Sequence, residues 1–418
     1  MPEAYRPQKA PQLPARTESV RDEIKDILRE KRAEEKELAN LRKSGADPKL
    51  IREKEEAVWE LERQIYGESA TPKALKLRDM KIKDIFGCPF LVDKEVLLFK
   101  RWFKENYNCD VAQSQKDEIA EAIYSYTERN ATPVQLAEGK AGPGFQIVPW
   151  KEETEEKTHG FFASPNSSLR TLLEKRQGQC VALTTLYCAL AEELGVKARP
   201  VHVREYENGK SAERGEDTGH FAPVVFHGDN KIIFDPVNNI PYAKHRGIIL
   251  EKEFLLIGSL TDQAIALRKE GNYGEAIALY DKALELNPNY ITALADKGTA
   301  LCSLGKYDEA IACYGKALEI NPDYVVALAG KGFALISMEK YEDALMPIER
   351  ALELNPGHFK SLANKGIALM ELESYEGARD AFESALFITD DPAIRSYYEL
   401  VLNAIKNQEG MPAESTPA

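Results

Sequence analysis

Residues 176–195 read RQGQCVALTTLYCALAEELG, and this stretch decides how the middle of the chain folds. From Cys180 onward its apolar residues cover every side of a helix, and Gly195 provides a C-terminal stop. A helix that is apolar all round is buried between other elements. The sequence therefore predicts a buried helix with a cysteine as its first residue.

Strand-like segments follow this helix at residues 198–203, 221–226 and 232–234. The last two are joined by the turn-forming sequence HGDN at residues 227–230, which predicts a β-hairpin. Helices followed by antiparallel strands predict an α+β domain.

The order and placement of three residues predict a thiol site. Cys180 begins the buried helix, where free backbone N–H groups and the helix dipole stabilise a thiolate. His220 begins a strand and can act as a general base, while Asp235 ends the next strand, near the position opposite His220. Taken singly, such residues are more often a packing cysteine, a satisfied strand histidine and a turn-forming aspartate. In this order and on these elements they predict a Cys-His-Asp triad.

Three short motifs carry a family resemblance. They are RQGQC at residues 176–180, opening a helix, GHF at 219–221, opening a strand, and FDP at 234–236, ending the next strand. Over roughly residues 160–240 the chain resembles the transglutaminase-like superfamily. Its members share a papain-like core and include cross-linking enzymes, peptidases, amidases, peptide glycanases and inactive relatives, so the resemblance alone does not name a reaction.

The resemblance implies acyl transfer through a thioester. Cys180 attacks an amide carbonyl, His220 moves the proton and Asp235 orients His220. The backbone N–H of Cys180 stabilises the oxyanion, and a side-chain amide before the cysteine, Gln177 or Gln179, is a candidate second donor. No cofactor is implied.

Other cysteines and the net charge indicate the compartment and the partners of the protein. Cys188 lies on the same buried helix, and Cys302 and Cys313 lie in later helices, so all three are interpreted as structural. No set of residues has metal-ligand spacing, and six cysteines in 418 residues do not form a disulfide framework, which favours the cytoplasm. The net charge of −13, without a long basic run, disfavours nucleic acid and anionic membrane as partners.

From about residue 257 the sequence repeats with a period of 34 residues. Small or aromatic residues recur at matching places: Ala276, Ala310, Ala344 and Ala378, then Tyr280, Tyr314, Ile348 and Phe382, then Ala283, Ala317, Ala351 and Ala385. Small residues let paired helices approach closely, and the aromatic residues fill the space between them. The pattern resembles four tetratricopeptide repeats, with residues 392–407 as the capping helix of an α-solenoid.

Such repeats form a concave groove from the first helix of each pair. The family's groove positions fall on Thr292, Ala295, Thr299, Val326, Ala329, Phe333, Lys360, Ala363 and Ile367, with Met370 nearby. These residues are mostly small or apolar, and the Lys and Asn residues that clamp a peptide carboxylate in some relatives are missing. The groove is therefore predicted to bind an apolar peptide or helix of a protein partner, or to be filled by the chain's own hairpin or capping helix.

The whole chain is predicted to be multidomain. Residues 1–68 form a disordered start and a charged helical hairpin or coiled coil, 69–256 a transglutaminase-like α+β domain, 257–407 the all-α repeats, and 408–418 a disordered tail.

Two functions remain open at this point. The first is an intracellular thiol enzyme that hydrolyses or transfers amide acyl groups, with the repeats recruiting a protein partner or substrate. The alternative is a non-catalytic interaction scaffold, in which an inactive transglutaminase-like platform carries the repeats.

Overall fold

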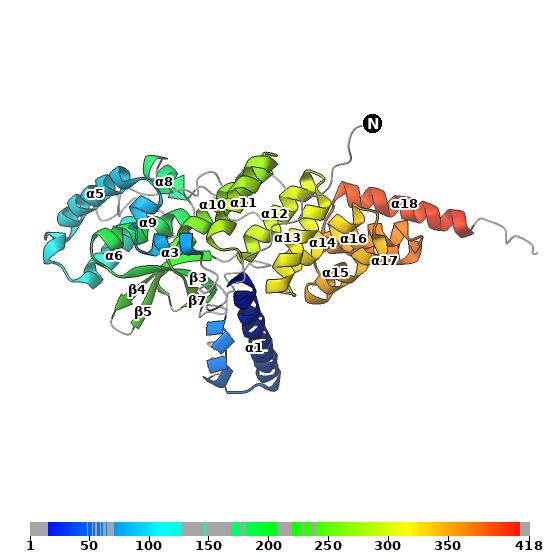
Figure 1. Ribbon diagram of the computed structural model, residues 1–418, viewed down its shortest axis with the longest axis horizontal. Coiled ribbons are helices and arrows are strands. Elements are labelled where there is room, and N and C mark those ends of the chain that lie inside the picture. Colours follow the sequence, from blue (N-terminus) through cyan, green and yellow to red (C-terminus); the bar gives the residue numbers. More distant parts are fainter. Residues whose placement is uncertain are drawn as a thin grey trace, which may run out of the picture. The chain divides into compact units, whose positions relative to one another are not determined.

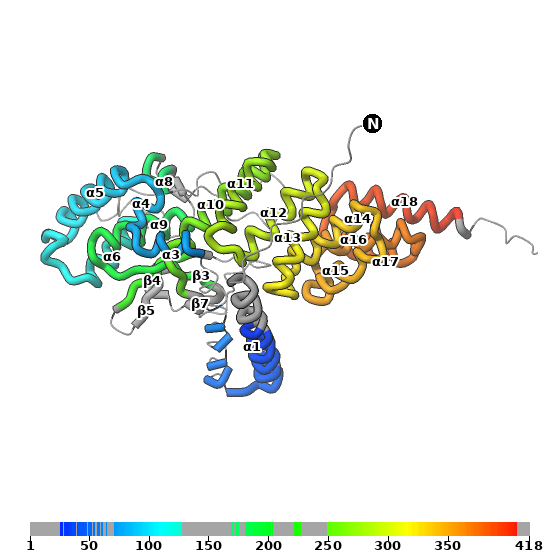
Figure 2. The backbone as a smooth tube through the Cα atoms, in the orientation of Figure 1, coloured from blue at the N-terminus to red at the C-terminus, as the bar shows by residue number. Residues whose placement is uncertain are grey.

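The structure is a computed structural model that describes residues 16–47, parts of 49–64, 71–127, 146–147, 169–175, 177–178, 180–206, 220–227, 230–235, 240–243 and 245–409 (Figure 2). The chain divides into two compact units, Met1–Ser69 and Ala70–Ala418. The predicted disordered start and most of the predicted tail lie outside the described residues.

The first unit is a helical hairpin, as predicted. Its first helix is α1 (Arg16–Ser44), and the described residues between 49 and 64 are also helical. Lys54 of the second helix lies 2.7 Å from the carboxylates of both Glu34 and Glu37 in α1. Three apolar side chains are buried: Leu38, Val58 and Leu61. The charged faces and thin apolar seam thus form a two-helix hairpin.

The second unit begins with helices that surround α9 (Cys180–Glu193). They are α3 (Pro72–Arg78), α4 (Ile82–Ile85), α5 (Pro89–Tyr107), the 3-10 helix η1 (Val111–Gln113), α6 (Lys116–Thr127) and α8 (Leu169–Lys175). Helix α9 contacts α4, α5, α6 and α8, and Tyr187 in its middle donates a 2.8 Å hydrogen bond to the carbonyl of Ala120 in α6. Every α9 residue from Cys180 to Ala191 is buried, which confirms the predicted internal helix. Among the described residues, no helix is long and apolar enough to cross a membrane.

A five-stranded antiparallel sheet lies against this helical layer (Figure 1). Its strands are β3 (Ala198–Tyr206), β4 (His220–His227), β5 (Asn230–Asp235), β6 (Ile240–Ala243) and β7 (His245–Ile249), in the order β6-β5-β4-β3-β7. The β4–β5 hairpin closes at the His227–Asn230 pair, as its turn sequence predicts. Helix α9 packs on the central strands β3 and β4. The short edge strands β6 and β7 were not predicted, because proline and charged residues interrupt their apolar pattern.

The remainder of the second unit consists of antiparallel helix pairs and a final helix. The pairs are α10 (Glu253–Lys269) with α11 (Tyr273–Leu286), α12 (Ile291–Ser303) with α13 (Tyr307–Ile320), α14 (Val325–Ile336) with α15 (Tyr341–Leu354), and α16 (Phe359–Glu371) with α17 (Tyr375–Ile388). Helix α18 (Pro392–Glu409) packs on α17 as the cap.

Glycines on the first helices of the later pairs bring the paired helices together. A Cβ added to Gly298 would lie 2.8 Å from the ring of Tyr314, and one added to Gly366 would lie 2.6 Å from the ring of Phe382. Real Cβ atoms do not approach so closely, so only glycine fits at these positions. The predicted combination of small residues and aromatics is therefore what spaces the repeats.

Candidate thiol site and repeat surface

Cys180 is the first residue of α9, and its side chain is only 2% exposed. Two buried threonines follow in the next turn of the helix. Thr185 donates a 2.6 Å hydrogen bond to the carbonyl of Val181, and Thr184 donates a 3.0 Å hydrogen bond to the carbonyl of Phe221 in β4. The thiol thus lies at the start of a helix that is fixed to the central strand.

The other two predicted triad residues occupy the ends of neighbouring strands. His220 is the first residue of β4 and pairs with Val203 of β3. Asp235 is the last residue of β5, two residues beyond Ile233, whose partner in β4 is Val224. Because the hairpin is antiparallel, the end of β5 runs toward the start of β4, where His220 lies.

Contacts beside these residues bring the starts of α9 and β4 together. Thr184 is one helical turn after Cys180, and Phe221, whose carbonyl Thr184 binds, directly follows His220. A Cβ added at Gly258 in α10 would lie 3.6 Å from both Cγ atoms of Val181 and 3.7 Å from Cε2 of Phe221. The residues directly after Cys180 and His220 therefore converge on one position of α10, which sequence reasoning had not singled out.

The segment before Cys180 forms the short strand β2 (Gln177–Gly178), which pairs in parallel with β1 (Gln146–Ile147). The pairing brings residues 146–147 beside the residues that precede the thiol. The backbone of the predicted oxyanion residue Gln177 lies in this strand, and Gln179 lies outside the described residues.

The three cysteines that were interpreted as structural are poor nucleophiles. Burial raises the pKa of the Cys188 thiol far above its ordinary value, and burial also raises the pKa of Cys302 and of Cys313. A thiol that stays protonated reacts slowly, so these residues are suited to packing. Within the part of the chain that the structure describes, no three His, Cys, Asp or Glu residues are grouped to hold a metal ion.

The predicted groove residues differ in their exposure. Phe333 of α14 is the most exposed of them, at 44%, whereas Ala295 and Ala329 are buried. The remaining residues are half-buried: Thr292, Thr299, Val326, Lys360, Ala363, Ile367 and Met370. Ile367 and Met370 pack in a cluster that includes Ile394 and Val401 of α18. At the C-terminal end of the array, two predicted groove residues thus pack against a cluster to which the capping helix contributes.

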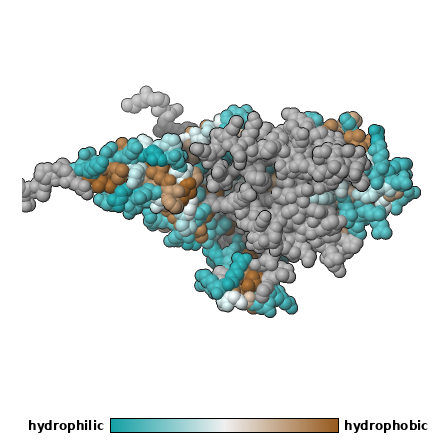
Figure 3. Space-filling view, turned by 180° about the vertical axis from the view of Figure 1, so that it is seen from behind, coloured by the Kyte–Doolittle hydropathy of each residue, from teal (hydrophilic) through white to brown (hydrophobic). Residues whose placement is uncertain are grey.

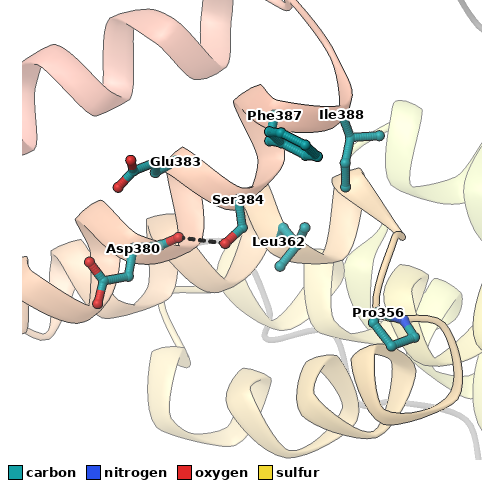
Figure 4. A pocket seen from close by; sticks show the side chains of 7 residues that line it. All are labelled: Pro356, Leu362, Asp380, Glu383, Ser384, Phe387 and Ile388. Carbon is teal, nitrogen blue, oxygen red and sulfur yellow. Dashed lines mark hydrogen bonds between the residues drawn. The ribbon is translucent and has the colours of Figure 1, made fainter.

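A second surface on the repeats was not predicted. An open pocket of about 500 Å³ is lined by Pro356, Leu362, Asp380, Glu383, Ser384, Phe387 and Ile388 (Figure 4). Phe387 is 93% exposed, and hydrophobic patches lie among hydrophilic surface on the coloured part of the repeats in Figure 3. The sequence held a signal for this surface, because the earlier repeats have glutamate at the position of Phe387: Glu285, Glu319 and Glu353.

Comparison with known families agrees with this architecture. Residues 151–236 match the transglutaminase-like superfamily core, and residues 267–332 and 331–393 match two tetratricopeptide-repeat models. The chain is therefore a transglutaminase-like domain fused to tetratricopeptide repeats, as the sequence motifs and the 34-residue period indicated. The repeats give it a protein-interaction role.

Solved structures resemble parts of the chain. The first tetratricopeptide domain of human RPAP3 is 25% identical, covers 30% of this chain and 100% of its own, and has a TM-score of 0.29. The first such domain of Spaghetti (RPAP3), bound to an HSP90 peptide, is 26% identical and covers 28% and 93%, with a TM-score of 0.27. A tetratricopeptide protein of Thermus thermophilus is 20% identical and covers 37% and 84%, with a TM-score of 0.34. No curated protein matches the chain significantly.

Proposed function

We propose that the protein is an intracellular, cytoplasmic thiol enzyme that cleaves or transfers amide acyl groups, with Cys180, His220 and Asp235 as its catalytic residues. The observation that carries the proposal is the hydrogen bond from Thr184 to the carbonyl of Phe221. It joins the helix that begins at Cys180 to the strand that begins at His220, within a domain that matches the transglutaminase-like superfamily.

The proposed reaction has two halves. The Cys180 thiolate forms a bond to the amide carbonyl carbon, protonated His220 delivers its proton to the leaving nitrogen, and the carbon–nitrogen bond breaks to give a thioester. Water or an amine then attacks the thioester, His220 accepts the proton of the attacking group, and the carbon–sulfur bond breaks. Asp235 accepts a hydrogen bond from His220 and keeps the imidazole oriented.

The oxyanion needs donors at the same place. The backbone N–H of Cys180 lies at the free N-terminus of α9 and is one proposed donor, with Gln177 or Gln179 as the second.

The transglutaminase-like domain is proposed to span residues 69–256 and the repeats 257–407. The repeats are proposed to bind a protein or peptide, with neither nucleic acid nor membrane as a partner.

One observation favours the alternative of a non-catalytic scaffold. The Cys180 side chain is almost fully buried, so a substrate reaches it only if neighbouring chain moves aside. In the scaffold the repeats alone carry the function, and the thiol domain is a platform.

Measuring the rate of iodoacetamide labelling at Cys180 distinguishes the two functions. Peptide mass spectrometry gives the rate from about pH 6 to pH 9 in the parent and in His220→Ala, with Cys188 on the same helix as an internal control. The enzyme predicts fast labelling that persists below about pH 7 and falls about tenfold or more in the variant. His358→Ala, in a repeat turn, serves as the matched histidine control.

The opposite outcome supports the scaffold. Labelling of Cys180 that rises only near the ordinary thiol value of about 8.5, at the same rate in His220→Ala, would falsify the proposed enzyme.

A further inference from the structure

The first helix of the repeat array also belongs to the thiol domain. Helix α10 contacts α11 and α12 of the array and also α9 of the thiol domain. Lys252, at its start, binds Glu192 near the end of α9 at 3.0 Å, and Glu253 binds Arg78 of α3 at 2.6 Å. The helix is therefore held from both the thiol domain and the repeats.

The face of α10 that touches the thiol domain is its groove face. Counting back one 34-residue period from Thr292, two from Val326 or three from Lys360 leads to Gly258. The groove position of α12 held by Ala295 corresponds in the same way to Thr261, and both residues are buried. Gly258 is buried, whereas its counterparts Thr292, Val326 and Lys360 are half-buried, so this groove position is covered in the first repeat.

The chain segments that cover this face are those that carry the thiol site. Val181 and Phe221 are the side chains in contact range of Gly258, and they directly follow Cys180 and His220. The repeats stack in order from this point, because α10 contacts α12, α12 contacts α14, and α14 contacts α16. The row of groove positions therefore begins beside the residues that follow Cys180 and His220.

From this continuity we infer that the ligand of the groove is the acyl donor itself: an extended peptide lies along α14 and α12, with an apolar side chain on Phe333 and its reacting carbonyl at Cys180. This inference rests on the proposed thiol chemistry. It identifies the peptide bound in the groove as the substrate of the thiol. The repeats then bind the substrate itself and not a second protein that takes no part in the reaction.

The helix packing fixes the number of peptide residues between the side chain that contacts Phe333 and the carbonyl that reacts with Cys180. Neighbouring packed helices lie about 10 Å apart, so α14 is about 20 Å from α10. The step from α10 to the thiol adds a few ångströms, and an extended peptide advances about 3.3 Å per residue. The residue on Phe333 thus precedes the reacting carbonyl by about seven residues.

Peptide probes of graded spacing test this inference. Each is a Gly/Ser peptide with a C-terminal chloromethyl ketone and a single Leu placed roughly two to twelve residues before it, a range that brackets the expected spacing. The Cys180 sulfur displaces chloride from the ketone, and peptide mass spectrometry measures the rate. The expected result is a maximum near seven residues, about fivefold or more above the shortest spacing, as the burial of one Leu side chain allows.

Two variants test whether the maximum in labelling rate arises from binding in the groove. Phe333→Ala is expected to abolish the dependence on spacing, while Met346→Ala, at a 74% exposed side chain on the partner helix α15, is expected to retain it. Circular dichroism of both variants establishes that the repeats remain folded.

The outcome separates this inference from the proposed enzyme. If labelling by iodoacetamide depends on His220 but the probe rates do not vary with spacing, the thiol chemistry stands and the inference is overturned. A maximum that survives in Phe333→Ala likewise overturns it, because the apolar contact then lies elsewhere.

Discussion

Asp262 is a buried carboxyl group on α10, at the position that Asp296 holds one repeat later on α12. Burial first, and the nearby Asp296 second, raise the pKa of Asp262 well above its usual range. Its Oδ2 has no hydrogen-bond partner among the described residues, while Arg268 lies 3.9 Å from Asp296 in the same region. Burial of this kind favours the neutral form of the carboxyl group.

Replacing Asp262 with asparagine is expected to flatten the dependence of stability on pH. The folded pKa is raised, so the native state keeps a proton that the unfolded chain releases above its ordinary value of about 3.9. The contribution of Asp262 to stability is therefore full below that pH and is lost as the pH rises toward the folded pKa, by up to about 1.4 kcal/mol per pH unit. Asp262→Asn removes this loss, which urea unfolding from about pH 4 to pH 8 measures.

The exposed Asp79→Asn serves as the control for this comparison. Equal pH slopes in the parent and Asp262→Asn would contradict the neutral form of Asp262 in the folded protein.

At the scale of elements, Gly258 lies where α10 approaches both α9 and β4. The helix interior favours alanine over glycine, and the space at Gly258 admits a methyl group at ordinary contact distance from Val181 and Phe221. A longer side chain has to displace one of these two residues. The contact is therefore selective for size.

Gly258→Ala is expected to raise the free energy of unfolding by up to about 1 kcal/mol, because alanine is the better helix former. Gly258→Leu is expected to lower it by about 1–3 kcal/mol through overpacking against Val181 and Phe221. Gly274, at the exposed start of α11, has no atom within 4 Å of an added Cβ, so Gly274→Leu is the matched control. Urea unfolding gives the three values, and a leucine tolerated equally at both positions would show that α10 does not touch the thiol domain closely.

Much of the element pattern could be predicted from the sequence. The repeats are visible because identical spacing recurs along the chain, and the β4–β5 hairpin is visible through the local turn at residues 227–230. The shared role of α10 could not be predicted in this way. Gly258 meets Val181 and Phe221, which lie far from it in sequence, and a glycine carries no chemical signal.

The same limit applies to the candidate site. Cys180, His220 and Asp235 were found from their order and from the ends of elements, which are local properties. The hydrogen bond between Thr184 and Phe221 is a tertiary contact, and no local pattern distinguishes that threonine from its neighbour Thr185.

At the scale of the second unit, the thiol domain and the repeats are tied at several points. The hydroxyl of Thr71 donates to the carbonyl of Glu285 in α11 at 2.9 Å, and Lys73 binds the Glu285 carboxylate at 2.7 Å. Arg78 reaches Glu253 in α10, and Lys252 donates to the carbonyl of Met80. The α3 segment therefore fastens the first repeat to the domain that contains α9.

These ties predict that the thiol domain and the repeats unfold together. All three tryptophans precede the repeats: Trp59, Trp102 and Trp150. In the variant Trp59→Phe, tryptophan fluorescence therefore reports the unfolding of the thiol domain. Far-UV circular dichroism is dominated by the helices of the repeats. The two signals are expected to give the same urea midpoint, as for one cooperative transition. A second transition seen only by circular dichroism would mean that the repeats unfold independently.

The shared helix also constrains how such a protein changes length over evolution. Solenoids usually gain and lose units by duplication or deletion, since each unit contacts only its neighbours. Here deletion of the first unit removes α10, and with it the surface against Val181 and Phe221, while a unit inserted ahead of it separates the array from the thiol domain. Relatives with more or fewer repeats are therefore expected to differ between α11 and α18, and to keep the first unit unchanged in position.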